Sequence, residues 1–523
     1  LKGTYPNPGP LGQILKDNPT KKVALKLPKT VEGLTDMSSC FQQCTNLVQV
    51  RNIPDGVTNM NNCFTECSSL TEAPAIPPSV QDITQCFNRC SSLVKAPAIP
   101  QGVTNMQNCF YDCTNLKEVP AIPDTVTNMR QCFMNCGSLT KAPALPANVT
   151  NMQGSFQSCG SLIEAPEIPA TAQFISYCFE GCGKIKSVVL KCNYRDGSFS
   201  DLFRNCASLE DGGIKVPAGQ LQDYKDHANK MKTTEKKFGV RVAYAELSAF
   251  LAGPNSSAAD VNYIEVTGLT KQDLQGDGQS HTPDPSPLGV ILNAHPTKKV
   301  ALKLGGGITG LTDMSYCFAR CENLVSVAAI PKGVTNMRSC FENCTSLKQA
   351  PVIPEGVTNM RYCFESCTSL KQVPVIPVGV TNMESCFIGC KSLEKAPTIP
   401  NSVTDMKHCF KGCTNLKQVP SISNTVTNMH ECFADCTNLT TVPSIPAAVT
   451  NMQGCFANCT KLTSVTLECD YNPATHQGNP IFGNAFVGCT ELKAGSIKVP
   501  QGQLSAYQAA ADDMGTTADR FVE

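Results

Sequence analysis

The sequence contains no tryptophan and few charged residues, and neither sign of charge is in excess. Only 16% of its 523 residues are charged, and 43 basic side chains balance 43 acidic ones. A chain without net charge has no overall attraction to nucleic acid or to an anionic membrane, so we predict no nucleic-acid partner. No apolar run is long enough to span a bilayer, so any membrane attachment is expected through a segment outside this chain.

Motifs typical of catalysis are also missing. The sequence has no glycine-rich phosphate-binding motif and no HExxH metal-binding motif, and its six histidines are scattered. We interpret His408 and His430 as exposed, solvated side chains. The sequence therefore predicts a non-enzymatic protein with no catalytic residue, no cofactor and no metal ligand.

A short motif recurs throughout the chain. VTNMQNCFYDC at residues 103–113 returns as VTNMRQCFMNC at 126–136 and as VTNMRSCFENC at 334–344, and the Cys-Phe step repeats every 23 residues in two series. A fixed short period is typical of a solenoid, in which each repeat buries its apolar side against its neighbours. Stacking of the repeats should align their phenylalanines into one buried column in each series. The predicted core comprises Phe41, Phe64, Phe87, Phe110, Phe133, Phe156 and Phe179, and then Phe318, Phe341, Phe364, Phe387, Phe410, Phe433 and Phe456.

A larger duplication divides the chain into two tandem modules. PLGQILKDNPTKKVALKL at residues 10–27 reappears as PLGVILNAHPTKKVALKL at residues 287–304. The segment VNYIEVTGL at 261–269 precedes the second module and has no counterpart before the first. We therefore expect that the N-terminal cap of the first module is truncated. The predicted organisation is an N-terminal cap (1–39), repeats (40–206), a C-terminal cap (207–245), a linker (246–260), a second linker and N-terminal cap (261–316), repeats (317–489) and a C-terminal cap (490–523).

Each repeat contains residues that predict an extended segment on one side and a turn or short helix on the other. Two prolines per copy, as in APAIP, remove backbone donors and predict short parallel strands with a weak ladder. The Thr-Asn pair before the Cys-Phe step suits a turn or a helix cap. The segment CFNRC at 86–90 would place both cysteines on one face of a short helix. The predicted fold is a repeat solenoid with short parallel strands on one side and short helices or turns on the other.

The paired cysteines allow four interpretations. Zinc would need about four converging ligands, and redox chemistry would need an exposed thiolate of low pKa. Disulfides need Cβ atoms that approach more closely than parallel side chains on stacked repeats readily do. Ser155, Leu202 and Ala485 replace the first cysteine in three copies, which favours packing by buried free thiols. Disulfides between Cys192 and Cys206 and between Cys469 and Cys489 remain open.

The extended segments carry an ordered set of charges. In the first module the second residue after the repeat leucine alternates in sign and should form a ladder of ion pairs, through Glu72, Lys95, Glu118, Lys141 and Glu164. In the second module Lys348, Lys371 and Lys417, with Lys395 nearby, form a candidate basic stripe for an acidic ligand. The alternative interpretation of these lysines is a solvated face without a ligand.

The 23-residue pattern F-x-x-C-x-x-L followed by Ile-Pro resembles the BspA-like leucine-rich repeats of bacterial surface proteins. This resemblance covers nearly all repeats and implies two tandem leucine-rich-repeat modules. It also implies an extracellular location at the bacterial cell surface and a non-enzymatic role in adhesion. The implied partners are host extracellular matrix proteins, host cells, a glycan or the surface of other bacteria. The alternative is a structural surface-layer protein that associates with itself.

Overall fold

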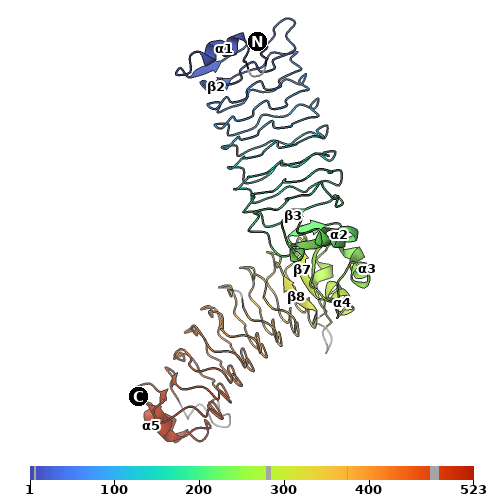
Figure 1. Ribbon diagram of the computed structural model, residues 1–523. Helices are drawn as coiled ribbons and strands as arrows, with labels where there is room; N and C mark the ends of the chain where they lie inside the picture. Colours follow the sequence, from blue (N-terminus) through green and yellow to red (C-terminus); the bar gives the residue numbers. More distant parts are fainter. Residues whose placement is uncertain (5–6, 278–283, 374, 472–481) are drawn as a thin grey trace. The chain divides into compact units, whose positions relative to one another are not determined.

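The computed structural model describes residues 1–4, 7–277, 284–373, 375–471 and 482–523. The chain divides into two compact units, Leu1–Arg241 and Val242–Glu523. Within each unit the repeats form a stack of thin parallel turns, with α1 at an end of the first stack and α5 at an end of the second (Figure 1). The stack confirms the predicted repeat solenoid.

The first unit has regular elements mainly at its ends. They are α1 (Pro10–Lys16), β1 (Val23–Leu25), β2 (Leu47–Val50), β3 (Val188–Val189), β4 (Ile214–Val216), η1 (Ala218–Gln220), α2 (Leu221–Asp226), η2 (Glu235–Lys237) and β5 (Phe238–Ala243), the last two residues of which belong to the second unit. Strand β1 pairs with β2, β3 with β4 and β4 with β5, all in parallel. The duplicated segment at residues 10–27 therefore supplies α1 and β1.

The second unit repeats this plan. Its elements are η3 (Tyr244–Glu246), α3 (Leu247–Ala252), β6 (Asn262–Thr267), η4 (Gln272–Leu274), α4 (Pro287–Asn293), β7 (Val300–Leu304), β8 (Leu324–Val327), β9 (Val465–Thr466), β10 (Ile497–Lys498), α5 (Leu504–Ala509), η6 (Ala518–Arg520) and β11 (Phe521–Val522). Parallel pairs join β6 to β7 and β7 to β8, and β10 lies between β9 and β11.

Between the caps the strands shrink to isolated bridges. On one side of the first unit Glu72 bridges to Lys95, and Lys95 to Glu118, always in parallel and one repeat apart. The prolines that follow these residues have no N–H to extend the ladder. The weak ladder predicted from the proline content is confirmed.

The other side of each repeat is built from turns, and the helical interpretation of the CFNRC segment is wrong. Gln85 and Arg89 have φ angles of 56° and 59°, which no right-handed helix contains. The N–H of Phe87 donates to the carbonyl of Cys109 in the next repeat at 2.9 Å instead of closing a helical turn. The turns therefore join neighbouring repeats through the backbone, as the strands do on the opposite side.

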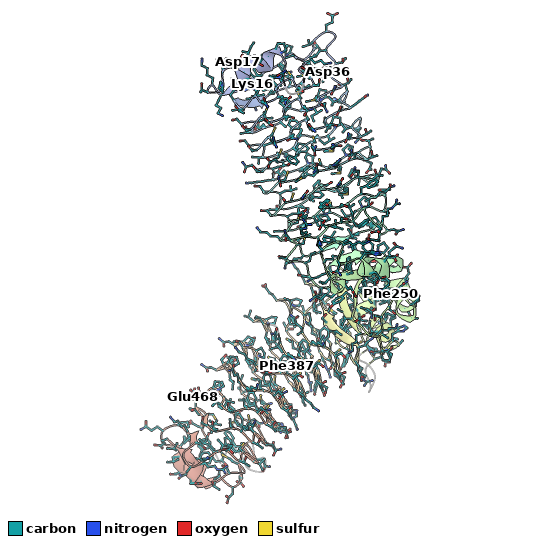
Figure 2. The ribbon with its side chains drawn as sticks, viewed as in Figure 1. Lys16, Asp17, Asp36, Phe250, Phe387 and Glu468 are labelled. Atoms are coloured by element: carbon teal, nitrogen blue, oxygen red, sulfur yellow. The ribbon has the colours of Figure 1, made fainter. Side chains whose placement is uncertain are left out.

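The phenylalanines occupy the interior of each stack. Successive rings stack at centroid distances between 5.4 and 6.2 Å, from Phe41 to Phe203 in the first unit and from Phe318 to Phe486 in the second. Every ring of the predicted core is fully buried. Side chains fill the stack around the labelled Phe387 (Figure 2). Each buried ring contributes roughly 1.5–3 kcal/mol before entropy costs, which makes the column the main source of cohesion.

The residues predicted as a linker at 246–260 lie within the second unit and begin with the helix α3. Leu247, Phe250 and Leu251 are buried side chains of α3, and the hydroxyl of Ser256 donates to the carbonyl of Leu251 at 2.7 Å. The residues from 253 to 260 form a mostly exposed turn between α3 and β6. Of the second predicted linker, residues 278–283 lie outside the described residues.

Candidate functional site

One side of the second unit exposes aliphatic side chains in an unusual concentration. The three most exposed large apolar side chains in the described part of the chain are Val352, Val375 and Val378, at 73%, 86% and 84%. Val352 and Val375 each directly precede an Ile-Pro step, and Val378 directly follows one. Exposed aliphatic groups gathered in this way are typical of an interaction surface.

Three adjoining hollows run along this side. The first, of about 370 Å³, is lined by Lys371, Val375 and Lys395 among others. The second, of about 430 Å³, shares Val375 with the first and adds Val352. The third, of about 470 Å³, shares Val352 with the second and extends to Lys332. We call this surface, made by the residues lining the three hollows, the valine face.

The predicted basic stripe is only partly assembled on the valine face. Lys371 and Lys395 line the first hollow, and Lys348 is exposed beside Lys371, whose N–H donates to the Lys348 carbonyl at 3.2 Å. Lys417 instead forms an ion pair with Glu394 at 3.1 Å. Among the described residues no ion pair engages Lys348, Lys371 or Lys395. Three positive charges therefore remain available to a ligand.

The first unit presents a different surface at the equivalent positions. Ala75 and Ala98 stand where the second module has Val352 and Val375. Its lysines are paired, Lys95 with Glu118 at 3.1 Å and Lys141 with Glu164 at 2.9 Å, in the manner predicted for the charge ladder. The sequence interpretation found the lysines but missed the valines, although the change from APAIP to APVIP marks the position.

The cysteines lie inside the stacks as free thiols. All are buried except Cys206, which is half-buried, and none is paired, so the disulfides left open for Cys192 with Cys206 and for Cys469 with Cys489 do not form. The Sγ of Cys113 donates to the carbonyl of Phe87 at 3.1 Å, and this bond to the phenylalanine one repeat back recurs along both stacks. Burial raises the pKa of the Cys159 thiol to about 12, which suppresses the reactive thiolate.

Serine replaces the first cysteine in one copy without loss of a polar contact. The hydroxyl of Ser155 is fully buried and donates to the carbonyl of Met129 at 2.7 Å. The same position also accepts Leu202 and Ala485, so it requires a side chain that fills the core and not a reactive group. This arrangement supports the packing interpretation of the cysteines.

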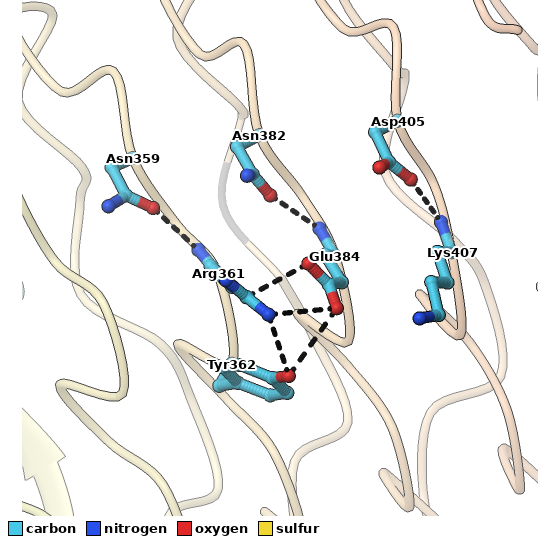
Figure 3. Close-up of polar contacts among 7 residues, drawn as sticks. All are labelled: Asn359, Arg361, Tyr362, Asn382, Glu384, Asp405 and Lys407. Atoms are coloured by element: carbon cyan, nitrogen blue, oxygen red, sulfur yellow. Dashed lines mark hydrogen bonds and ion pairs between the residues drawn. The ribbon is translucent and has the colours of Figure 1, made fainter. Parts of the chain in front are cut away.

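The turn side is organised by asparagine and aspartate side chains. The Oδ1 atom of Asn382 accepts the N–H of Glu384 at 2.9 Å, and Asp405 accepts that of Lys407 at 2.8 Å (Figure 3). These Asx turns recur in nearly every repeat and explain why Asn or Asp follows threonine there. Between repeats, Arg361 and Glu384 form a two-bond ion pair, with Nε–Oε2 at 2.9 Å.

Replacing Asn382 by alanine is expected to lower the free energy of unfolding by about 1 kcal/mol, because the Glu384 N–H loses its acceptor. The measurement is the midpoint of urea denaturation followed by circular dichroism. Asn382→Asp is the matched control, since aspartate accepts the same bond at position 405, and it should change stability little. Equal losses in both variants would contradict this role.

The repeat geometry agrees with a comparison of the sequence with known families. The family model described as a BspA type leucine rich repeat region matches residues 20–139, 85–210, 314–408 and 383–502, well over half of the chain. The chain belongs to the BspA-type leucine-rich repeat family. No curated protein matches its sequence significantly. No helix in the described part of this BspA-type protein has the length and hydropathy to cross a membrane.

Several solved structures are similar to this BspA-type protein. A leucine-rich repeat protein from Bacteroides ovatus shares 18% identity over 96% of this chain and 92% of its own, with a TM-score of 0.30. A leucine rich cell surface protein from Faecalibacterium prausnitzii shares 20% identity over 80% and 78%, with a TM-score of 0.22. The leucine rich repeat protein of T. pallidum shares 26% identity over 31% and 78%, with a TM-score of 0.28.

Proposed function

We propose that the protein is a non-enzymatic adhesin of the bacterial cell surface, and that its valine face binds an extended segment of a host extracellular protein. The supporting observation is the juxtaposition of Val352 and Val375 with Lys371 and Lys395 in adjoining hollows. Aliphatic side chains of the ligand would fill the hollows, and its carboxylates would face the two ammonium groups. A segment that alternates acidic and aliphatic residues fits this chemistry best.

The apolar part of the face argues for a protein ligand over a sulfated glycan. A polyanionic sugar would use the lysines but would leave two highly exposed valines in contact with polar groups. Burial of each valine contributes roughly 1.5–3 kcal/mol when it is complete, so the valines can supply much of the affinity. The lysines would set orientation and speed association, as complementary charges do at interfaces.

Binding of the full-length protein to a panel of immobilised extracellular matrix proteins tests this function. Among matrix proteins that bind, we expect the double variant Lys371→Gln/Lys395→Gln to bind about tenfold more weakly, and Val352→Ala/Val375→Ala to lose a similar factor. Surface plasmon resonance measures both affinities, with circular dichroism to show that each variant is folded.

The first module provides the matched control. Lys95→Gln/Lys141→Gln removes two lysines that are already paired, so it should leave the affinity unchanged. Absence of saturable binding to every matrix protein would overturn the proposal. Binding to heparin alone that depends on the lysines but not the valines would identify a glycan ligand instead. Sedimentation of the unliganded protein separately tests the alternative of a self-associating surface layer.

A further inference from the structure

Three metal-ligating side chains meet on the turn side of the second unit, away from the residues of the valine face. One ligand atom from each of His408, His430 and Glu431 lies within 4.8 Å of the others. His408 Nε2 is 3.5 Å from a carboxylate oxygen of Glu431, and the two imidazole centroids are 5.0 Å apart. His408 and Glu431 occupy the same position in successive repeats, so stacking of the repeats alone brings them together.

The backbone holds this cluster in place. The N–H of His408 donates to the carbonyl of His430 at 2.8 Å, which fixes the two repeats in register at this point. His408 and Glu431 have φ angles of 55° and 48°, so both belong to the regular pattern of left-handed turn residues. Because the backbone of this turn is fixed by hydrogen bonds, the side chains can converge on an ion by rotation about their own torsion angles.

The two histidines are not the solvated side chains expected from the sequence. Both are half-buried, with 25% of the His408 side chain exposed. Burial, as the largest effect, lowers the pKa of both imidazoles below the ordinary value, while the Glu431 charge acts in the opposite direction. Both rings therefore lie next to the Glu431 carboxylate and not in bulk solvent.

We propose that His408, His430 and Glu431 form a binding site for Zn²⁺, with water completing a tetrahedral shell. Two imidazoles and one carboxylate are a ligand set that zinc accepts, whereas Ca²⁺ and Mg²⁺ prefer oxygen ligands alone. Zinc ligands lie about 2 Å from the ion. The three side chains must therefore close around it, which their partial exposure permits.

A lysine competes for the carboxylate of this site. The ammonium group of Lys411 pairs with Glu431. Burial acts to raise the pKa of Glu431, but the Lys411 hydrogen bond and charge, with the nearby imidazoles, hold it below its ordinary value. Lys407 also faces the histidines, and the carboxylate of Asp405 partly offsets its charge at His430. Zinc must therefore displace Lys411 to bind.

Titration of the full-length protein with Zn²⁺ by calorimetry, and with Co²⁺ by visible absorption, tests the site. We expect one ion per chain and a tetrahedral Co²⁺ spectrum without thiolate charge-transfer bands. His408→Gln and His430→Gln should each weaken binding about tenfold or more. Lys411→Met should strengthen binding severalfold, because the competing ammonium group is gone, and a purely structural role of the cluster would not produce this gain.

A histidine elsewhere in the second unit serves as the control. His295, beside α4, contacts the hydroxyl of Ser248 at 3.4 Å, and His295→Gln should leave metal affinity unchanged. Circular dichroism shows whether each variant retains the fold. The proposal is overturned if wild-type protein binds no stoichiometric metal, if the Co²⁺ spectrum shows thiolate ligation, or if Lys411→Met weakens binding.

Discussion

Raising the pH from 8 to 10 is expected to unfold the protein. Burial raises the pKa of the thiols of Cys159, Cys413 and Cys489 to about 12, and it raises the pKa of many others further. In the unfolded chain these thiols ionise near the ordinary value of 9.0. Above that pH the unfolded chain releases protons that the folded chain retains, so stability falls as pH rises; below it the full contribution is present.

The size of this effect follows from the number of thiols. At pH 10 each such thiol lowers the free energy of unfolding by about 1.4 kcal/mol. About ten of them together remove about 14 kcal/mol, close to the upper end of the roughly 5–15 kcal/mol that stabilises a typical domain. Tyr224 and Tyr507, whose pKa values are also raised by burial, act in the same direction.

Circular dichroism against pH in anaerobic, reducing buffer measures the transition. Alkylation with iodoacetamide provides the control, because the thiols should react slowly at pH 8 and together once the fold is lost. At pH 8 only the half-buried Cys206 is expected to react early. A fold that persists at pH 10 would contradict this prediction.

Replacing Phe110 by alanine is expected to lower the free energy of unfolding by about 3–5 kcal/mol. The ring is fully buried and stacks on Phe87 at 5.5 Å and on Phe133 at 5.7 Å, so truncation leaves a cavity between two repeats. Because repeats contact only their neighbours, amide exchange should accelerate most in residues 87–133. Urea denaturation and hydrogen exchange measure the two effects.

An exposed phenylalanine in the same unit gives the matched control. Phe174 is 51% exposed and lies outside the ring column. Phe174→Ala should therefore change stability by only about 0.5 kcal/mol. Similar losses in the two variants would mean that the ring column is not the main source of cohesion.

Much of the fold follows from the period of the sequence. A 23-residue repeat requires each copy to bury the same positions against its neighbours, which predicts the stack, the column of rings from Phe41 onward and the separate caps. Proline at two positions per copy predicts the reduced strand ladder. These features depend on residues that recur every 23 positions, and this recurrence can be read from the sequence.

Prediction from a short segment of sequence was wrong where hydrogen bonds between repeats determine the backbone conformation. The CFNRC segment has helical spacing, but alternate N–H groups, those of Gln85, Phe87 and Arg89, bond to the next repeat. Gln85 and Arg89 accordingly adopt left-handed turn conformations. This outcome cannot be read from a single segment.

The sequence by itself determined that this is a solenoid with a phenylalanine core, because the same burial is required every 23 residues. Only the tertiary structure decided which exposed side chains become neighbours. Val352 and Val375 meet between lysines, and His408 meets His430 and Glu431, although these partners are 22 or 23 residues apart. Stacking of the repeats brings residues that are about 23 positions apart next to one another. The register between neighbouring turns then determines which side chains share a surface.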